Sequence, residues 1–295
     1  MAEHYETLLL DRVGTDGRVG RITLNRPDRM NTLSKEFFRE FDEALHDYEA
    51  DQSVRVIIVR GSGRGFSAGY DLTPGYTGGG ARSYKQQDEQ GRPLVINTRT
   101  DMQQITDVLM YFWNTAKVTI AQVHGWALAG GCELAMMADL VVAAEDAQLG
   151  HPALRGLGTA REGIIWPLVI GMRKAKELFY TGDTVSGVEA ERIGMINYAW
   201  PAEQLDDRTI AFADHVANMS ADHLALLKIT MNRFYENMGI YSSVRSATDL
   251  DAMGRMTEQG YAFMEKMIEA LRSGKSLKTA FEWRDAPYRE YRAKE

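Results

Sequence analysis

Apolar residues along the first two thirds of the chain recur with two different periods. Runs rich in β-branched residues predict strands over 5–10, 19–24, 54–61 and 118–125. Apolar residues three and four positions apart predict helices over 35–51, 100–113 and 172–182. Ser34 is a suitable N-cap for the first of these helices, and Gly182 closes the last. The stretch 126–146 predicts a glycine turn, a helix and another strand, so this part is a mixed α/β core.

The pattern changes near residue 205. Helical periodicity continues over 207–220, 221–239, the long stretch 240–274 and 276–285, with no strand signal between them. We therefore predict a core over residues 1–205 and a helical C-terminal region over 206–295. Residues 73–93 are rich in Gly and Gln and lack apolar periodicity, which predicts a mobile loop of a length that is often functional.

Composition excludes several classes of protein. Hydrophobic residues make up 44% and charged residues 25%, as in ordinary globular chains, and the net charge is -7. No basic stripe is present, which argues against a nucleic-acid partner. No apolar run approaches the ~20 residues of a membrane span, and the N-terminus lacks signal or transit features. The single cysteine, Cys132, allows no disulfide framework and is expected as a small buried residue, so we expect a cytoplasmic protein.

Two short motifs suggest chemistry that their surroundings do not support. The run GFSAG at 65–69 matches G-x-S-x-G, in which a serine nucleophile stands at a strand-to-helix turn. Here Pro74 and Gly75 lie where that helix should run, so we interpret Ser67 as a small residue in a tight loop. The run GSGRGF also fails the dinucleotide-binding spacing, because Phe66 takes the place of the third glycine.

Two other glycine turns, AGYDL at 68–72 and LAGGCEL at 128–134, each follow a predicted strand. Glycine lets a backbone approach a ligand closely, and the second turn opens a helix whose first N–H groups point outward. Two such turns side by side could offer two N–H donors to one oxygen, which is the arrangement of an oxyanion hole.

These turns belong to a larger set of motifs. LNRPDRMNTL, GFSAGYDL, VHGWALAGGCELAMMADLVVAAEDAQLGHP and AKELFYTGDTVSGVEA occur in the order found in the crotonase (enoyl-CoA hydratase/isomerase) superfamily, which the chain therefore resembles over most of its length. The resemblance implies an α/β fold: a crotonase-like spiral of ββα units with a helical C-terminal region. It also implies a homotrimer or homohexamer. Phe281, Trp283 and Tyr288 are aromatic candidates for such contacts or for a pocket cover, although plain packing is the simpler interpretation.

The resemblance also implies roles for single residues. The backbone N–H groups of Tyr70 and Gly130 would form the oxyanion hole, and Glu133 would be the general acid/base, with a pKa raised by burial. A plainer interpretation of Glu133 is a carboxylate favoured by the helix dipole. The residues expected along CoA are Ala68, Asp71 and Leu72 at the adenine end and Arg26 and Arg29 near the phosphates. CoA would arrive as part of the substrate, with no resident cofactor or metal.

One family position is altered. Hydratases of this family carry a second glutamate just after the following strand, where this chain has Ala153. Glu162 lies where some family isomerases carry a carboxylate and is the candidate to fill the gap. His151 could also titrate near neutral pH, or simply be a hydrogen-bonded loop residue. Arg155 and Arg161 could serve an acidic substrate or pair with Glu162.

The function that the resemblance implies is acyl-CoA chemistry through a stabilised enolate. Hydration of a 2-enoyl-CoA to a 3-hydroxyacyl-CoA is the first expectation, and double-bond isomerisation is the second, because one carboxylate can shuttle a proton. A catalytically poor acyl-CoA-binding protein and a hydrolase using Ser67 remain as alternatives from other classes. The acyl group is not predicted, because residues 73–93 and the following helix would set it.

Overall fold

The computed structural model of the protein describes residues 5–72 and 94–292. Its main sheet has the strand order β1-β2-β3-β4-β6-β9, in which β1 is antiparallel to β2 and the other pairs are parallel. The strands are β1 (Leu8–Val13), β2 (Val19–Leu24), β3 (Val56–Gly61), β4 (Val118–Val123), β6 (Leu140–Ala144) and β9 (Tyr198–Trp200). The continuous apolar run of β3 places it at the buried centre, as such runs do in parallel sheets. The four strands predicted by range are confirmed, with β1 beginning three residues late, and β6 is the further strand predicted within 126–146.

A second sheet of three short strands lies beside the first. It contains β5 (Trp126–Leu128), β7 (Gln148–Gly150) and β8 (Thr184–Ser186), in the order β5-β7-β8. Single β-bridges from Ser67 to Ala127 and from Leu33 to Tyr70 extend this pairing into the loops before residue 72. Strands of three residues carry too little alternation to be recognised, and the sequence interpretation treated 147–171 as loop.

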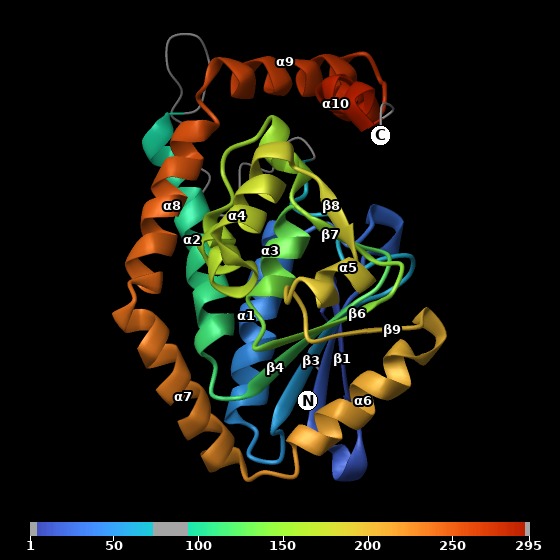
Figure 1. Ribbon diagram of the computed structural model, residues 1–295, viewed down its shortest axis with the longest axis vertical. Helices are drawn as coiled ribbons and strands as arrows, with labels where there is room; N and C mark the ends of the chain where they lie inside the picture. The colour runs from blue at the N-terminus through green and yellow to red at the C-terminus, as the bar shows by residue number, and fades with distance from the viewer. Residues whose placement is uncertain (1–4, 73–93, 293–295) are drawn as a thin grey trace.

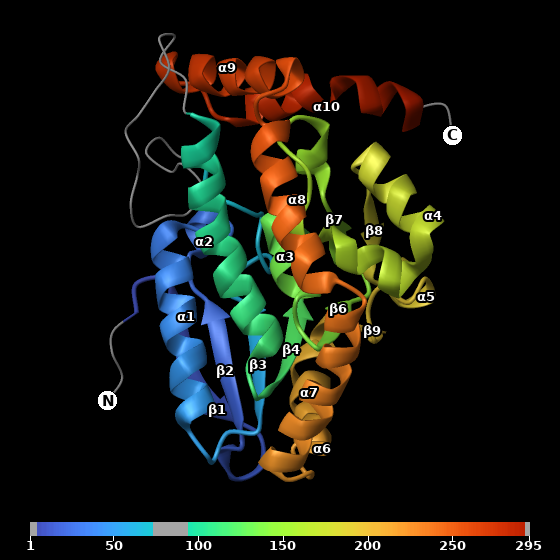
Figure 2. The same cartoon turned by 90° about the vertical axis from the view of Figure 1, so that its left-hand side faces the viewer.

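The helices of the first region are α1 (Lys35–Ala50), α2 (Val95–Asn114), α3 (Gly130–Met136), α4 (Ile165–Thr181) and α5 (Gly187–Arg192). Ser34 caps α1 as predicted, because its hydroxyl accepts a hydrogen bond from Phe37 N at 3.2 Å. Short 3-10 turns are η1 (Thr15–Gly17), η2 (Pro27–Arg29), η3 (Pro152–Arg155), η4 (Arg161–Ile164) and η5 (Ala202–Gln204). Figure 2 shows α1, α2 and α8 side by side along one face of the molecule.

All elements described after η5 are helices: α6 (Leu205–Val216), α7 (Ala221–Asn237), α8 (Ile240–Gly254), α9 (Glu258–Arg272) and α10 (Lys278–Arg292). The predicted single stretch over 240–274 is two helices, because the Thr257 hydroxyl caps a new one by accepting from Gly260 N. Helix α6 packs on β2, β3, β4 and β6, and Ala213 and Val244 belong to the same buried core as the sheet. The division at residue 205 stays a prediction.

Helices α9 and α10 lie across one end of the molecule, beyond the tips of the other elements (Figure 1). Phe281 packs on Phe263 with ring centroids 6.0 Å apart, and the Arg155 guanidinium lies 4.3 Å from the centre of the Tyr288 ring. Trp283 is 46% exposed. Plain packing thus accounts for two of the three aromatic candidates. The predicted loop over 73–93 lies outside the described residues. None of the helices that the structure describes is long and apolar enough to cross a bilayer.

Candidate active site

The two glycine turns lie directly against each other. Ser67 N donates to Trp126 O at 2.9 Å and Leu128 N donates to Ser67 O at 3.0 Å, which joins the first turn to β5. A methyl group on Gly69 would lie 3.2 Å from Gly130 N, and one on Gly131 would lie 2.5 Å from Ser67 O. Glycine is therefore required on both sides, because only its missing side chain lets the two backbones approach.

The second turn has an unusual backbone conformation just before α3. Ala129 has φ 50° and ψ -125°, a region that residues with a side chain rarely adopt, and Gly130 is the first residue of α3. The first N–H groups of a helix have no acceptor inside the helix, so the Gly130 N–H is directed away from α3. The Tyr70 ring lies against Gly130, since a methyl group there would be 2.5 Å from its Cε2. Tyr70 and Gly130 are thus in contact through the Tyr70 ring, and the oxyanion hole formed by their N–H groups stays a prediction.

Glu133, one turn into α3, is buried among hydrogen-bonding groups from other elements. His151 Nε2 lies 3.1 Å from one carboxylate oxygen. The Tyr70 hydroxyl donates to the other oxygen, and Arg161 Nη2 lies 3.4 Å from it. A carboxylate held only by the helix dipole would have none of these side-chain partners. Glu133 is part of a polar cluster in an otherwise apolar core.

The expected direction of the Glu133 pKa is wrong. Burial does raise the pKa of Glu133, and it is the largest single effect. The Arg161 charge and then the hydrogen bonds of His151 and Tyr70 together outweigh burial, so the pKa of Glu133 lies below its ordinary value. Glu133 is therefore held as a carboxylate at neutral pH.

Arg161, in η4, is the cation at the centre of this cluster and is only 1% exposed. Its Nη2 donates to the Tyr70 hydroxyl, and its Nη1 donates to Met102 O in α2 at 3.2 Å. The guanidinium carbon lies 4.9 Å from the centre of the Tyr70 ring. The sequence interpretation paired Arg161 with Glu162 or with an acidic substrate. In the structure, its described carboxylate partners include Glu133.

The second described carboxylate beside Arg161 comes from the C-terminal region. Asp251 in α8 lies 4.0 Å from Arg161 Nε and 3.6 Å from Arg255 Nη2, and it accepts a hydrogen bond from Thr159 N at 2.5 Å. Burial raises the pKa of Asp251, and the charges of Arg255 and Arg161 lower it only partly. Sequence reasoning missed Asp251, because no local motif marks an aspartate in the middle of a helix.

This raised pKa predicts a pH dependence of stability for Asp251→Asn. The folded protein binds the Asp251 proton more tightly than the unfolded chain does, so this group favours folding below the unfolded pKa of ~3.9. The contribution of Asp251 to the free energy of unfolding falls as pH rises from the pKa of Asp251 in the unfolded chain through its pKa in the folded protein. We expect the free energy of unfolding of the wild type, minus that of Asp251→Asn, to decrease as pH rises from about 3.5 to 7 in urea titrations. A difference that is constant or increases with pH would contradict the raised pKa.

The remaining predicted acid/base candidates differ in outcome. His151 is 5% exposed and is a hydrogen-bond partner of Glu133. Ala153 lies in η3 and brings only a methyl group. Glu162 belongs to η4, but its side chain lies outside what the structure describes, so its catalytic role stays a prediction. Arg155 pairs with Asp183 at 2.6 Å, away from Glu133.

The residues predicted along CoA lie in two neighbouring loops. Arg26 Nη1 donates to Asp71 Oδ2 at 2.9 Å, so these two predicted contacts are each other's partners. Ala68 N donates to Met30 O, and this hydrogen bond holds the two loops together. Leu72 is the residue after Asp71 in the chain. Arg29 has a side chain that is 56% exposed, with its nearest described carboxylate, Asp28, 3.9 Å away. Arg29 is accordingly the more available cation of the two arginines for a phosphate.

Ser67 has a structural role. Its hydroxyl donates to Asn31 O at 2.8 Å and accepts from Gly69 N at 3.1 Å, and the residue is 1% exposed. The preferred interpretation of a small residue in a tight loop agrees with these contacts. A serine nucleophile needs a neighbouring base, and the described hydrogen-bond partners of the Ser67 hydroxyl are both backbone groups.

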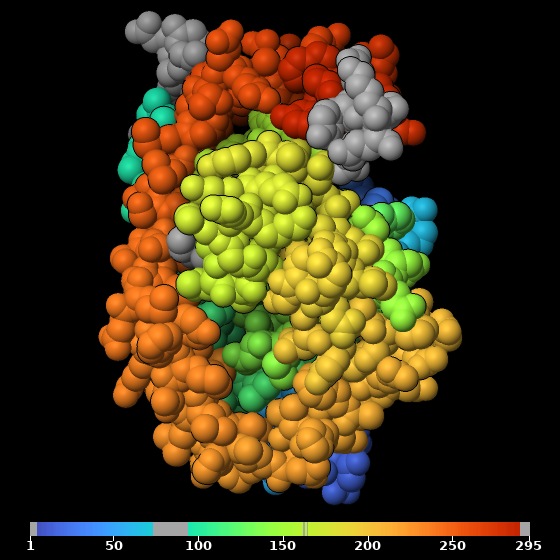
Figure 3. Space-filling model, in the orientation of Figure 1, coloured from blue at the N-terminus to red at the C-terminus, as the bar shows by residue number. Residues whose placement is uncertain are grey.

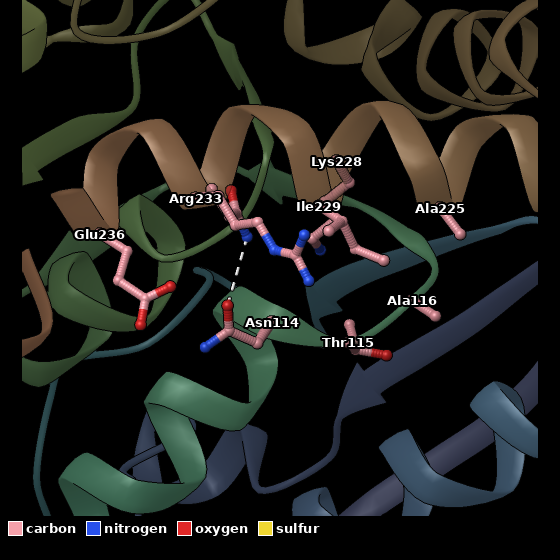
Figure 4. Close-up of a pocket in the computed structure, with 9 residues that line it drawn as sticks. Asn114, Thr115, Ala116, Ala225, Lys228, Ile229, Arg233 and Glu236 are labelled. Carbon is pink, nitrogen blue, oxygen red and sulfur yellow. Dashed lines mark hydrogen bonds between the residues drawn. The ribbon is translucent and has the colours of Figure 1, made fainter.

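A cleft of about 150 Å³ lies elsewhere, between α7 and the end of α2 (Figure 4). Asn232 Nδ2 donates across it to Asn114 Oδ1 at 3.4 Å, and Lys228 at its base is bound to Asp139 at 2.7 Å. None of the residues lining this cleft belongs to the Glu133 cluster. We do not choose this cleft as the candidate active site. The two glycine turns and the titratable groups meet at Glu133, and this combination is a better indication of an active site than a cleft alone.

Comparisons with known proteins agree with this geometry. A family model described as enoyl-CoA hydratase/isomerase matches residues 14–269. A protein named "Probable enoyl-CoA hydratase" from Rhizobium meliloti is 34% identical over 79% of this chain and 83% of its own. The crystal structure of an enoyl-CoA hydratase from Mycobacterium smegmatis superimposes with a TM-score of 0.85 at 30% identity, covering 96% of this chain and 94% of that one.

An enoyl-CoA hydratase/isomerase structure from Xanthobacter autotrophicus Py2 superimposes with a TM-score of 0.82 at 35% identity, covering 96% of this chain and 99% of that one. The matches thus span both the sheet and the C-terminal helices. Because the family model covers most of the chain and the solved folds superimpose over nearly all of it, this chain belongs to the enoyl-CoA hydratase/isomerase family.

Proposed function

We propose that the protein hydrates a 2-enoyl-CoA to a 3-hydroxyacyl-CoA through an enolate stabilised by backbone N–H groups. The observation that carries this proposal is the close contact between the turns of Tyr70 and Gly130, beside a buried and ionised Glu133. A thioester oxygen placed between the two N–H groups gains negative charge as water adds at Cβ. Donors fixed in advance bind that charge better than the neutral carbonyl, which lowers the barrier.

Glu133 is the base in this proposal. Its low pKa keeps it ionised at neutral pH, and the carboxylate takes a proton from water as oxygen bonds to Cβ. His151 and Arg161 hold the carboxylate in place from two sides. CoA enters with the substrate, along the loops that contain Arg29, Ala68 and Leu72, and the reaction as proposed requires no further cofactor.

Isomerisation of an enoyl-CoA double bond is the second candidate. The specific observation in its favour is Ala153, which leaves Glu133 without the second family carboxylate in η3. A single base can remove a proton from one carbon and return it to another. A panel of 2-enoyl- and 3-enoyl-CoA thioesters separates the two reactions, because hydration removes the 2-enoyl absorbance and isomerisation of a 3-enoyl substrate creates it.

Acyl-CoA binding is testable without turnover. A ligand that binds only the folded state and is present at ~100 times its Kd adds about 2.7 kcal/mol to the free energy of unfolding. We expect millimolar acetyl-CoA to raise the melting temperature in a thermal scan, with adenosine alone as the control. No shift with any acyl-CoA, together with no competition between them, would remove the basis for both candidate reactions.

We also propose that the protein acts as a homotrimer or homohexamer in the cytoplasm. Apolar side chains are exposed along α7 and α8, which run along an outer edge of the molecule (Figure 3), among them Leu226 (63%), Phe234 (62%), Met231 (57%) and Met253 (59%). Large apolar side chains exposed on two successive helices support a contact with another subunit. Light scattering should give a mass of three or six times 33.1 kDa, and a mass near one chain would contradict an oligomer.

A further inference from the structure

Hydration needs two proton movements, and Glu133 accounts for one of them. Water must lose a proton as it bonds to Cβ, and Cα must gain one to quench the enolate. In this chain the second family carboxylate is replaced by Ala153, whose methyl group moves no proton. The following inference rests on the proposed function and concerns the source of the proton at Cα.

The Tyr70 side chain occupies the space between the two turns and Glu133. Its ring lies against Gly130, at the start of α3, with Cε2 2.5 Å and Cζ 2.6 Å from where a methyl group on that glycine would be. The phenol oxygen contacts both charged groups of the cluster, since it donates to Glu133 and accepts from Arg161 Nη2. The Phe38 ring stacks on the Tyr70 ring, with ring centroids 6.2 Å apart, and so limits the movement of the tyrosine ring.

We propose that the Tyr70 phenol is the second acid/base group and delivers the proton to Cα. As the water oxygen bonds to Cβ, an O–H bond of water breaks and its proton passes to Glu133. The electron pair of the C=C bond moves into the enolate and then forms the Cα–H bond with the phenol proton. The phenol O–H bond breaks and leaves a phenolate. Glu133 then returns its proton to that phenolate along their existing hydrogen bond, so the site is reset and the net change is addition of water to the enoyl-CoA to give a 3-hydroxyacyl-CoA.

The surroundings of the phenol suit this role. Arg161 donates to the phenol oxygen and is 1% exposed, so its charge is weakly screened and stabilises the transient phenolate. Glu133, which ends the water step protonated, is already the hydrogen-bond partner of Tyr70. Among the residues whose side chains the structure describes, the other titratable groups of the cluster are His151 and Asp251. They touch Glu133 and Arg161, and no hydrogen bond described for either of them goes to the phenol.

The first test is Tyr70→Phe in the full-length protein, assayed with a 2-enoyl-CoA in deuterated water. Removing a general acid typically costs 10²–10⁴-fold, so we expect kcat to fall by about that factor with KM changed by only a few fold. Tyr111→Phe is the matched control, because the Tyr111 phenol also donates to a glutamate, Glu49, away from this cluster. Wild-type kcat in Tyr70→Phe, with deuterium still entering at Cα, would overturn the proposal.

A second measurement separates proton transfer from simple positioning of Glu133, and it also applies if Tyr70→Phe does not fold. Incorporation of 3-fluorotyrosine at position 70 keeps the shape and hydrogen bonds of the phenol but makes it more acidic. We expect the alkaline limb of the kcat profile to move to lower pH, and not to move with 3-fluorotyrosine at position 111. An unchanged limb would show that Tyr70 only positions Glu133, and would overturn the proposal.

Failure of the proposed function gives a different result. If wild type hydrates no 2-enoyl-CoA, exchange of the Cα protons of a saturated acyl-CoA with deuterated water still reports enolate formation and quenching. Exchange that is lost in Tyr70→Phe and kept in Tyr111→Phe would support the Tyr70 role without hydration. Exchange that is equal in all three proteins, or absent from the wild type, would overturn it.

Discussion

Replacing Glu133 with Gln is expected to lower kcat for 2-enoyl-CoA hydration by about 10²–10⁴-fold while acyl-CoA affinity is kept. The amide keeps the size of the side chain but cannot take a proton from water. That loss corresponds to about 3–5 kcal/mol of transition-state stabilisation, at 1.36 kcal/mol for each factor of ten. Stopped-flow loss of the 2-enoyl absorbance measures kcat, and calorimetric titration with a saturated acyl-CoA measures affinity.

The same substitution should also destabilise the fold. Glu133 neutralises Arg161, and breaking a buried ion pair by removing one partner typically costs 3–5 kcal/mol. Glu40→Gln is a matched control, since Glu40 in α1 is 1% exposed and accepts from Thr7 N at 2.8 Å, and none of its described partners belongs to the Glu133 cluster. The Glu40→Gln substitution should lower the stability of the fold without lowering kcat. Full turnover by Glu133→Gln would remove Glu133 from the mechanism.

Gly131→Ala should also lower kcat strongly, because it increases the distance between the two turns. The added methyl group would lie 2.5 Å from Ser67 O and 2.8 Å from Ser67 Cβ, so the backbones must move apart. If the N–H groups of Tyr70 and Gly130 bind one oxygen as proposed, moving these two groups apart weakens that binding. Loss of one such donor typically costs about 10²–10³-fold in kcat, and overpacking costs about 1–3 kcal/mol of stability.

Gly17→Ala separates this effect from the general strain of replacing a glycine. Gly17 lies in η1 with φ +64°, and a methyl group there meets only the Arg12 side chain, at 3.7 Å. It should cost about 1–2 kcal/mol of stability from the left-handed backbone and leave kcat unchanged. Steady-state kinetics and thermal melts of both variants measure the two effects. Wild-type kcat in Gly131→Ala would show that contact between the turns is not needed for catalysis.

Local signals in the sequence predicted the elements that carry them. The Ser34 cap and the apolar spacing after it correctly predicted α1, and the β-branched run before Gly61 correctly predicted β3. The strands β7 and β8 were missed, because three residues show no usable alternation. Their pairing is fixed by contacts between distant segments, which a single local pattern does not contain.

The candidate site shows the same division. The motif order identified Tyr70, Gly130 and Glu133, and the structure brings all three together. The direction of the Glu133 pKa was wrong, because it depends on an arginine in η4 and a histidine before η3 that reach the carboxylate only in the folded chain. The Tyr70 side chain was overlooked for a related reason, since the family pattern at that position concerns the backbone N–H alone.

The contact between Asp251 and Arg161 has a consequence for how the protein is made. A chain leaves the ribosome from its N-terminus, at about 5–20 residues per second, so both turns, Glu133 and Arg161 emerge before α8 exists. Until α8 docks, Arg161 lacks one carboxylate and Thr159 N lacks its acceptor. The loop that presents Arg161 to Tyr70 is therefore completed late, and a nascent chain that ends before Asp251 holds the reactive groups without the support that fixes their arrangement.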